Sequence, residues 1–128
     1  MTQFTLLFGS LLGGLAVIFG AFGAHALKKI LSEEQLKSFE TGVKYQMYHA
    51  LVLLIIGFNL ELKTTLETLM AYSFITGVIL FSFSIYGLVI SSAKNKKLAF
   101  LGPITPLGGL LLIIGWGLLF VTVFTSAT

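Results

Sequence analysis

The feature that most constrains this chain is an uncharged apolar run that extends from Phe4 to Leu27. About 20 apolar residues in an α-helix cross the roughly 30 Å hydrocarbon layer of a bilayer, so this run is long enough to span a membrane. Further uncharged windows follow at residues 45–60, 68–93 and 98–128. The sequence therefore predicts one all-α membrane domain over residues 1–128, a four-transmembrane-helix bundle with spans at about 4–27, 43–62, 69–90 and 104–124.

The composition supports this class and excludes several others. Of the 128 residues, 56% are hydrophobic and only 10% are charged, which is more apolar than a soluble core of this size needs. The basic residues are all lysines, whereas nucleic-acid readers favour the planar fork of arginine, so we expect no nucleic-acid partner. The chain has no cysteine, and no carboxylate lies near the middle of a predicted span, so we expect neither an enzyme nor a metal site.

The first run ends in Ala24-His25-Ala26, which resembles the cleavage site of a signal peptide. A signal peptide carries Lys or Arg before its apolar segment, whereas Lys28 and Lys29 follow the run here. The run is also longer than the apolar segment of such a leader. We therefore expect a membrane span and not a cleaved leader.

Small residues recur at helical spacing in the first span. They share one helix face, and such a face lets two helix backbones approach closely in lipid. We expect this helix at the centre of the bundle and a similar contact over the glycines of the fourth span, with Trp116 as a further packing residue. The predicted packing residues are Gly9, Gly13, Ala16, Gly20, Gly23, Gly108, Gly109 and Gly115. This abundance of glycine also predicts a homo-oligomer within membrane lipid.

Lysines predict the orientation in the membrane. Loops rich in lysine near span ends stay in the cytoplasm. Only Lys63 lies between the second and third spans, whereas the loops after the first and third spans hold Lys28, Lys29, Lys37, Lys44, Lys94, Lys96 and Lys97. We expect both lysine-rich loops in the cytoplasm and both termini outside the plasma membrane.

The segment between the first two spans carries a helix start signal. Ser32 followed by Gln35 is a capping box. The residues that follow have an apolar stripe flanked by charges, which predicts a short amphipathic helix on the inner membrane surface with a bend at Gly42. The alternative is that these residues extend the second span into the cytoplasm.

Polar residues gather near the cytoplasmic ends of the predicted spans. Ionisable residues within a span face the bundle interior and mark a site, so this layer is the candidate functional site. Its residues are His25, Tyr45, Gln46, His49, Ser82, Ser84, Tyr86 and Thr105. We consider two interpretations: the side chains satisfy one another and fix the helix register, or they form a binding pocket or proton-linked path, since histidine titrates near neutral pH. We expect no cofactor, and a haem held between His25 and His49 is the alternative.

Four motifs occur in order along the chain: Gly20-Ala-Phe-Gly-Ala-His25-Ala-Leu27, Tyr45-Gln46 followed by His49-Ala50-Leu51, Phe81-Ser82-x-Ser84-Ile85-Tyr86, and Ile104-Thr105-Pro106-Leu107-Gly108-Gly109 leading to Gly115-Trp116. Together they resemble the YgdD-like family, domain of unknown function 423, which consists of small bacterial inner-membrane proteins and has a eukaryotic relative, transmembrane protein 256. One departure is Phe83, where the resemblance suggests glycine between the two serines. The resemblance implies four spans in the bacterial plasma membrane and no established activity.

These observations favour a non-enzymatic membrane protein, either a structural or assembly component or a binder of lipid or of a partner at the inner leaflet. The alternative is a small transporter or channel for protons or small polar solutes. Transport requires a polar path to the outer face, and the sequence concentrates its polar residues in the inner half.

Overall fold

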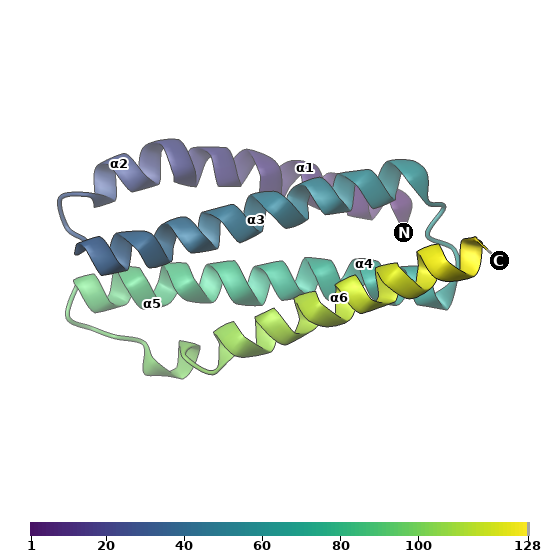
Figure 1. Cartoon of the computed structure of the whole chain (residues 1–128). Coiled ribbons are helices and arrows are strands. Elements are labelled where there is room, and N and C mark those ends of the chain that lie inside the picture. Colours follow the sequence, from purple (N-terminus) through teal and green to yellow (C-terminus); the bar gives the residue numbers. More distant parts are fainter. Residues whose placement is uncertain (128) are drawn as a thin grey trace.

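A computed structural model describes residues 1–127 and, within them, every side chain except that of Ala24. Four helical rods lie side by side, and the two termini lie at the same end of the molecule (Figure 1). The first rod consists of α1 (Thr2–Ile18), η1 (Phe19–Gly23) and α2 (Ala24–Leu27), and the second is α3 (Glu33–Asn59). The third rod consists of α4 (Thr65–Val78), η2 (Ile79–Phe83) and α5 (Ser84–Ala93). A short helical turn, η3 (Ala99–Leu101), leads to the fourth rod, α6 (Ile104–Ser126). The all-α prediction is confirmed.

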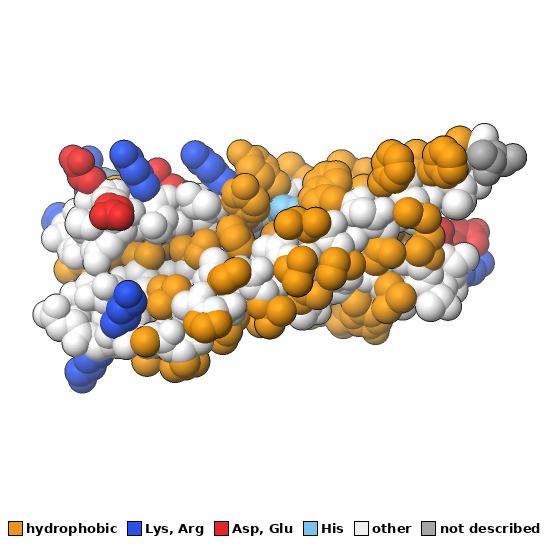
Figure 2. Space-filling view, turned by 60° about the horizontal axis from the view of Figure 1, so that its bottom comes forward, with side chains coloured by type: hydrophobic (Ala, Val, Ile, Leu, Met, Phe, Trp, Pro, Cys, Tyr) orange, Lys and Arg blue, Asp and Glu red, His pale blue; other side chains and the backbone are white. Residues whose placement is uncertain are grey.

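Three helical stretches are long and apolar enough to cross a membrane, namely Thr2–Leu27, Thr65–Ala93 and Ala99–Ser126. The remaining rod, α3, is long enough but less apolar, because Lys44, Gln46 and His49 lie near its middle. Hydrophobic side chains cover most of the middle of the molecule, and charged side chains gather toward its two ends (Figure 2).

Helix α3 begins at the predicted cap. The Ser32 hydroxyl accepts a hydrogen bond from the Gln35 backbone N–H at 3.1 Å, and the Gln35 side-chain oxygen accepts one from the Ser32 N–H at 3.0 Å. The helix then continues through Gly42 without interruption. The segment is therefore continuous with the helix that contains the second predicted span, as the second alternative expects, and it forms no separate helix. Phe39, from the apolar stripe, packs on Tyr86 of α5.

The rods pack mainly on their neighbours in chain order. Within residues 1–127, α1 packs along α3, α3 along α4–η2–α5, and α6 along α4 and η2, while the backbones of α3 and α6 do not approach each other closely. Helices α3 and α6 therefore flank α4 and η2 with a space between them.

Small residues lie where two of these helix pairs meet. A Cβ atom added to Gly9 would lie 3.1 Å from the Ala50 carbonyl oxygen, and Ala16 is buried. A Cβ added to Gly108 would collide with the backbone nitrogen of Phe81. The predicted small face of α1 is thus covered by α3 of the same chain, and burying this face needs no second copy of the chain. The expected central position of this helix is wrong, because α1 packs almost entirely on α3 and lies at one side of the four rods.

Two rods contain a π-helical turn, η1 in the first and η2 in the third. Such turns widen a helix locally and occur often at functional sites, and no sequence signal predicted them. Phe83, at the end of η2, packs edge-on against Phe19 of η1 and against Tyr86. The phenyl ring at this unexpected position therefore fills a contact between the two π-helical rods.

Candidate functional site

The predicted polar layer separates into three groups in the structure. The first group is centred on Gln46, which is fully buried. Its Nε2 donates to the Leu12 carbonyl at 2.8 Å, and its Oε1 accepts from the Tyr86 hydroxyl at 2.7 Å. Ser82 donates to the Gly42 carbonyl at 2.7 Å. These bonds tie α1, α3 and the η2–α5 rod together, as the register interpretation expects.

The second group is a single pair. The hydroxyl oxygens of Ser84 and Thr105 lie 2.6 Å apart and connect the start of α5 to the start of α6. Ser84 also donates to the Phe81 carbonyl at 3.0 Å. This pair ties the first turns of α5 and α6 together.

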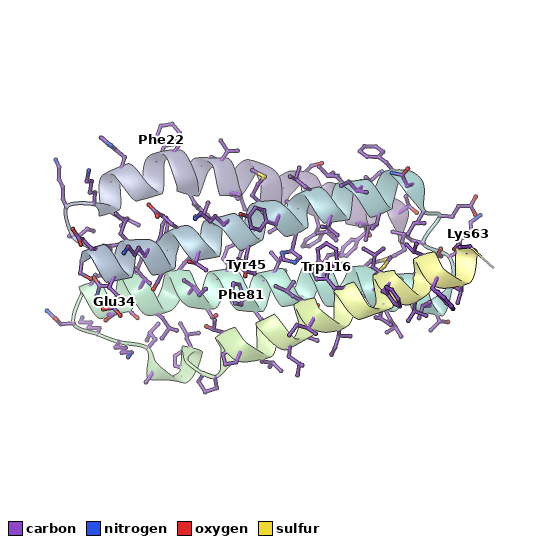
Figure 3. The ribbon with its side chains drawn as sticks, viewed as in Figure 1. Phe22, Glu34, Tyr45, Lys63, Phe81 and Trp116 are labelled. Carbon is purple, nitrogen blue, oxygen red and sulfur yellow. The ribbon has the colours of Figure 1, made fainter. Side chains whose placement is uncertain are left out.

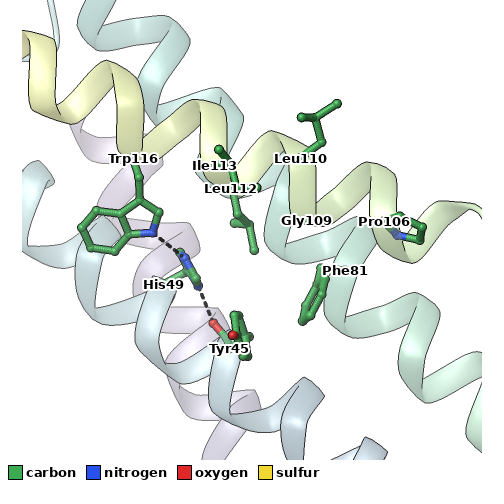
Figure 4. Close-up of a pocket in the computed structure, with 9 residues that line it drawn as sticks. All are labelled: Tyr45, His49, Phe81, Pro106, Gly109, Leu110, Leu112, Ile113 and Trp116. Carbon is green, nitrogen blue, oxygen red and sulfur yellow. Dashed lines mark hydrogen bonds between the residues drawn. The ribbon is translucent and has the colours of Figure 1, made fainter.

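The third group contains His49, which is only 4% exposed. The indole N–H of Trp116 lies 3.1 Å from His49 Nε2, and because indole nitrogen can only donate, Nε2 is the acceptor. His49 Nδ1 therefore carries the proton and donates to the Tyr45 carbonyl at 2.7 Å. The result is a neutral imidazole with both ring nitrogens paired (Figure 4).

His25 does not belong to this group. It is exposed on α2, and the neighbouring Gly23 lies against Phe39 of α3. Phe39 and His49 are ten residues apart on one helix, which separates them by about 15 Å. The two histidines therefore do not face a common space and do not offer the two axial ligands of one haem. Within residues 1–127, no three His, Asp or Glu side chains are grouped to hold a metal ion.

A cavity of about 550 Å³ lies between α3 and α6. Tyr45 and Trp116 project into this space from the two helices, and Phe81 of η2 lies beneath it (Figure 3). Leu110 and Ile113 on its rim are exposed, so the cavity opens sideways, away from the other rods. We call it the α3–α6 groove, and it is lined by Tyr45, His49, Phe81, Pro106, Gly109, Leu110, Leu112, Ile113 and Trp116.

Three rings close one end of the groove. Trp116 packs edge-on against Phe74 of α4, with ring centroids 5.6 Å apart, and His49 lies 5.8 Å from the same ring. Phe74 reaches this position because Gly115 has no side chain, and a Cβ there would lie 2.8 Å from the Phe74 ring. The end of the groove is therefore built from three rods.

Trp116 was predicted as a packing residue, and its hydrogen bond was not predicted. The signal was present, since a tryptophan in the middle of an apolar helix needs a partner for its N–H group. His49 is the residue that accepts this bond. Of the predicted layer, only Tyr45 and His49 line the groove.

Comparison with known proteins identifies relatives of the whole chain. Residues 19–109 match the family model described as "Protein of unknown function (DUF423)". A UPF0382 membrane protein of Staphylococcus aureus is 40% identical over 122 residues, which cover 95% of this chain and 96% of the relative. The UPF0382 membrane protein YwdK of Bacillus subtilis is 37% identical over 113 residues, covering 87% and 88% of the two chains. No solved structure matches the chain.

Proposed function

Because the chain belongs to the DUF423 family of bacterial membrane proteins, we propose that it is a non-enzymatic plasma-membrane protein that binds the acyl chain of an inner-leaflet phospholipid in the α3–α6 groove. The observation that carries this proposal is the groove itself, which is apolar and open sideways along the length of the helices. A ligand that enters such a groove comes from the hydrocarbon layer and not from water.

The proposed orientation places the lysine-rich end in the cytoplasm. Lys28 and Lys29 follow α2, and Lys94, Lys96 and Lys97 follow α5, so the two loops lie at the same end of the rods (Figure 1). At the opposite end, Lys63 is paired with Glu61 at 2.7 Å. With this orientation all four rods cross the bilayer, and the first turns of α3 extend into the cytoplasm.

The length of the groove supports an acyl chain as its occupant. Along α6 it extends from Pro106 to Trp116, ten residues, which correspond to about 15 Å. This length is about half of the roughly 30 Å hydrocarbon thickness and so equals one leaflet.

A basic side chain beside the groove suits a phospholipid head group. Tyr45 lines the groove one helical turn, about 6 Å, to the cytoplasmic side of His49, so its ring lies beside the acyl chain. The exposed Lys44 beside Tyr45 favours an anionic phospholipid, because a lysine near the membrane surface contributes about 1 kcal/mol of attraction to anionic lipid.

The alternative function, transport of protons or polar solutes, has less support. It needs polar groups that continue from the cytoplasmic half to the outer face. The side chains of Ser10, Asn59 and Thr122 in the outer half bond to carbonyls of their own helices. They therefore satisfy themselves locally and do not extend the inner polar groups outward.

Native mass spectrometry of the protein purified with its lipid tests the proposal. Gly109 lines the groove, and a Cβ there would lie 3.8 Å from Phe81, so Gly109→Leu fills the groove without a backbone collision. Gly117→Leu is the matched control on the same helix, because nothing lies within 4 Å of its Cβ position.

We expect wild type and Gly117→Leu to retain phospholipid, and Gly109→Leu to retain less. Retention that is equal in all three proteins would contradict a binding site in the groove. Thermal unfolding of each variant shows whether the fold is intact.

A further inference from the structure

We infer that the three rings at the outer end of the groove, which are Trp116, His49 and Phe74, act as a stop that selects the length of the bound acyl chain. This inference rests on the proposed function, and it adds that the protein distinguishes phospholipids by the length of the acyl chain. The stop lies midway along α6, where the groove ends.

Trp116 closes a space that the helices themselves leave open. The backbones of α3 and α6 do not approach each other closely, so only side chains cross between them. The indole crosses from α6 and ends 3.1 Å from the imidazole of α3. A chain that lies along Leu110 and Ile113 therefore meets the indole at the outer end.

The stop is held in place from several sides. His49 is fixed by the Tyr45 carbonyl at 2.7 Å, so it presents Nε2 to the indole in one orientation. Phe74 is fully buried and supports both rings from below. A ring that contacts two other rods resists displacement by a flexible chain, so its position defines a length.

Farther along α6 the surface is open. Phe120, one turn beyond the stop, is 72% exposed and stacks on Phe124 of its own helix. Removing the indole would join the groove to this open surface. A bound chain could then extend past the present end, so Trp116 is the specificity-determining residue.

The test is the chain length of the phospholipid that the full-length protein retains from vesicles. The vesicles contain phosphatidylglycerols of graded acyl length in equal amounts, and the retained chains are measured by gas chromatography. Trp116→Ala removes the stop, and Phe120→Ala is the matched control, an aromatic residue on the same helix outside the groove.

We expect wild type and Phe120→Ala to be enriched in the same chain length, and Trp116→Ala to shift toward longer chains. Ile113→Phe provides a second variant that keeps the Trp116–His49 hydrogen bond, and Ile113 is 68% exposed, so the added ring meets no buried side chain. It places a ring one turn nearer the inner end, so it shifts retention toward shorter chains.

Two results would overturn the inference in distinguishable ways. Retained phospholipid with the same length distribution in wild type, Trp116→Ala and Ile113→Phe would refute the stop and leave the lipid site intact. Wild-type protein that retains no more phospholipid than Gly109→Leu would refute both the stop and the proposed function.

Discussion

The indole N–H of Trp116 donates a hydrogen bond to Nε2 of His49 at 3.1 Å, across 67 positions of sequence. The two residues belong to helices whose backbones do not approach each other closely. The bond therefore joins α3 to α6, and both of its rings pack on Phe74 of α4. It gives the α3–α6 groove its outer end. It also fixes His49 as a neutral ring, since a proton on Nε2 would face the indole proton.

The first prediction concerns this bond. His49→Phe and Trp116→Phe each remove one partner, and the double variant removes both. Inter-helix hydrogen bonds in membrane proteins contribute about 0.6 kcal/mol and up to about 2 kcal/mol, so we expect a coupling energy in this range. Reversible unfolding in detergent of the four proteins measures it. Additive effects would show that the two rings do not stabilise each other.

The second prediction concerns Gln46. Gln46→Leu removes both bonds of a fully buried amide and leaves the Tyr86 hydroxyl without its acceptor, which costs about 1–3 kcal/mol. Adding Tyr86→Phe removes the orphaned hydroxyl, so we expect the double variant to recover part of the lost stability. The free energy of unfolding of the three proteins is the measurement. A double variant less stable than Gln46→Leu would argue against the network.

The third prediction concerns the close contact of Gly108 with the backbone of η2. Gly108→Ala forces the backbones of α6 and η2 apart, because the new Cβ would collide with the Phe81 nitrogen and lie 2.9 Å from the Gly77 oxygen. We expect a loss of about 1–3 kcal/mol, the usual cost of overpacking. Gly117→Ala, which adds a methyl group in open space, is the control. Equal melting temperatures of the two variants would disprove this contact.

The fourth prediction concerns orientation. The natural chain has no cysteine, so a single cysteine reports its side of the membrane without background. We expect Asn95→Cys to react with a membrane-impermeant thiol reagent only from the cytoplasm, and Lys63→Cys only from outside. The reverse pattern would invert the protein and place the groove in the outer leaflet.

Much of the fold could be predicted from the sequence, because its signals are local. The Ser32–Gln35 cap lies within one helical turn, and each long uncharged window of the sequence predicts a helix. The small face of α1 predicted a close helix contact, although not that α3 of the same chain would fill it. The π-helical turns escaped prediction because they depend on packing between rods.

The site was predicted only in part. The boundaries of the predicted spans give each polar residue an expected depth in the membrane. Residues of similar depth were grouped, and this correctly placed Gln46 with Tyr86. Depth alone also grouped His25 with His49, and the structure separates them because α2 lies opposite the first turns of α3. The partner of Trp116 depends on how far α6 leans from α3, which no local pattern encodes.

Fluorescence quenching tests the central claim, an acyl chain in the α3–α6 groove, most directly. Trp116 is the only tryptophan in the chain and lines the groove, so its emission reports lipid at the groove. In vesicles that mix ordinary and brominated anionic phospholipid, we predict quenching of wild type and Gly117→Leu that exceeds the bulk fraction of brominated lipid. Bromine near the chain terminus should act most strongly, because Trp116 lies midway along α6. In Gly109→Leu, quenching should fall to the bulk fraction. Quenching that follows the bulk fraction in all three proteins, with no dependence on bromine position, would contradict the account.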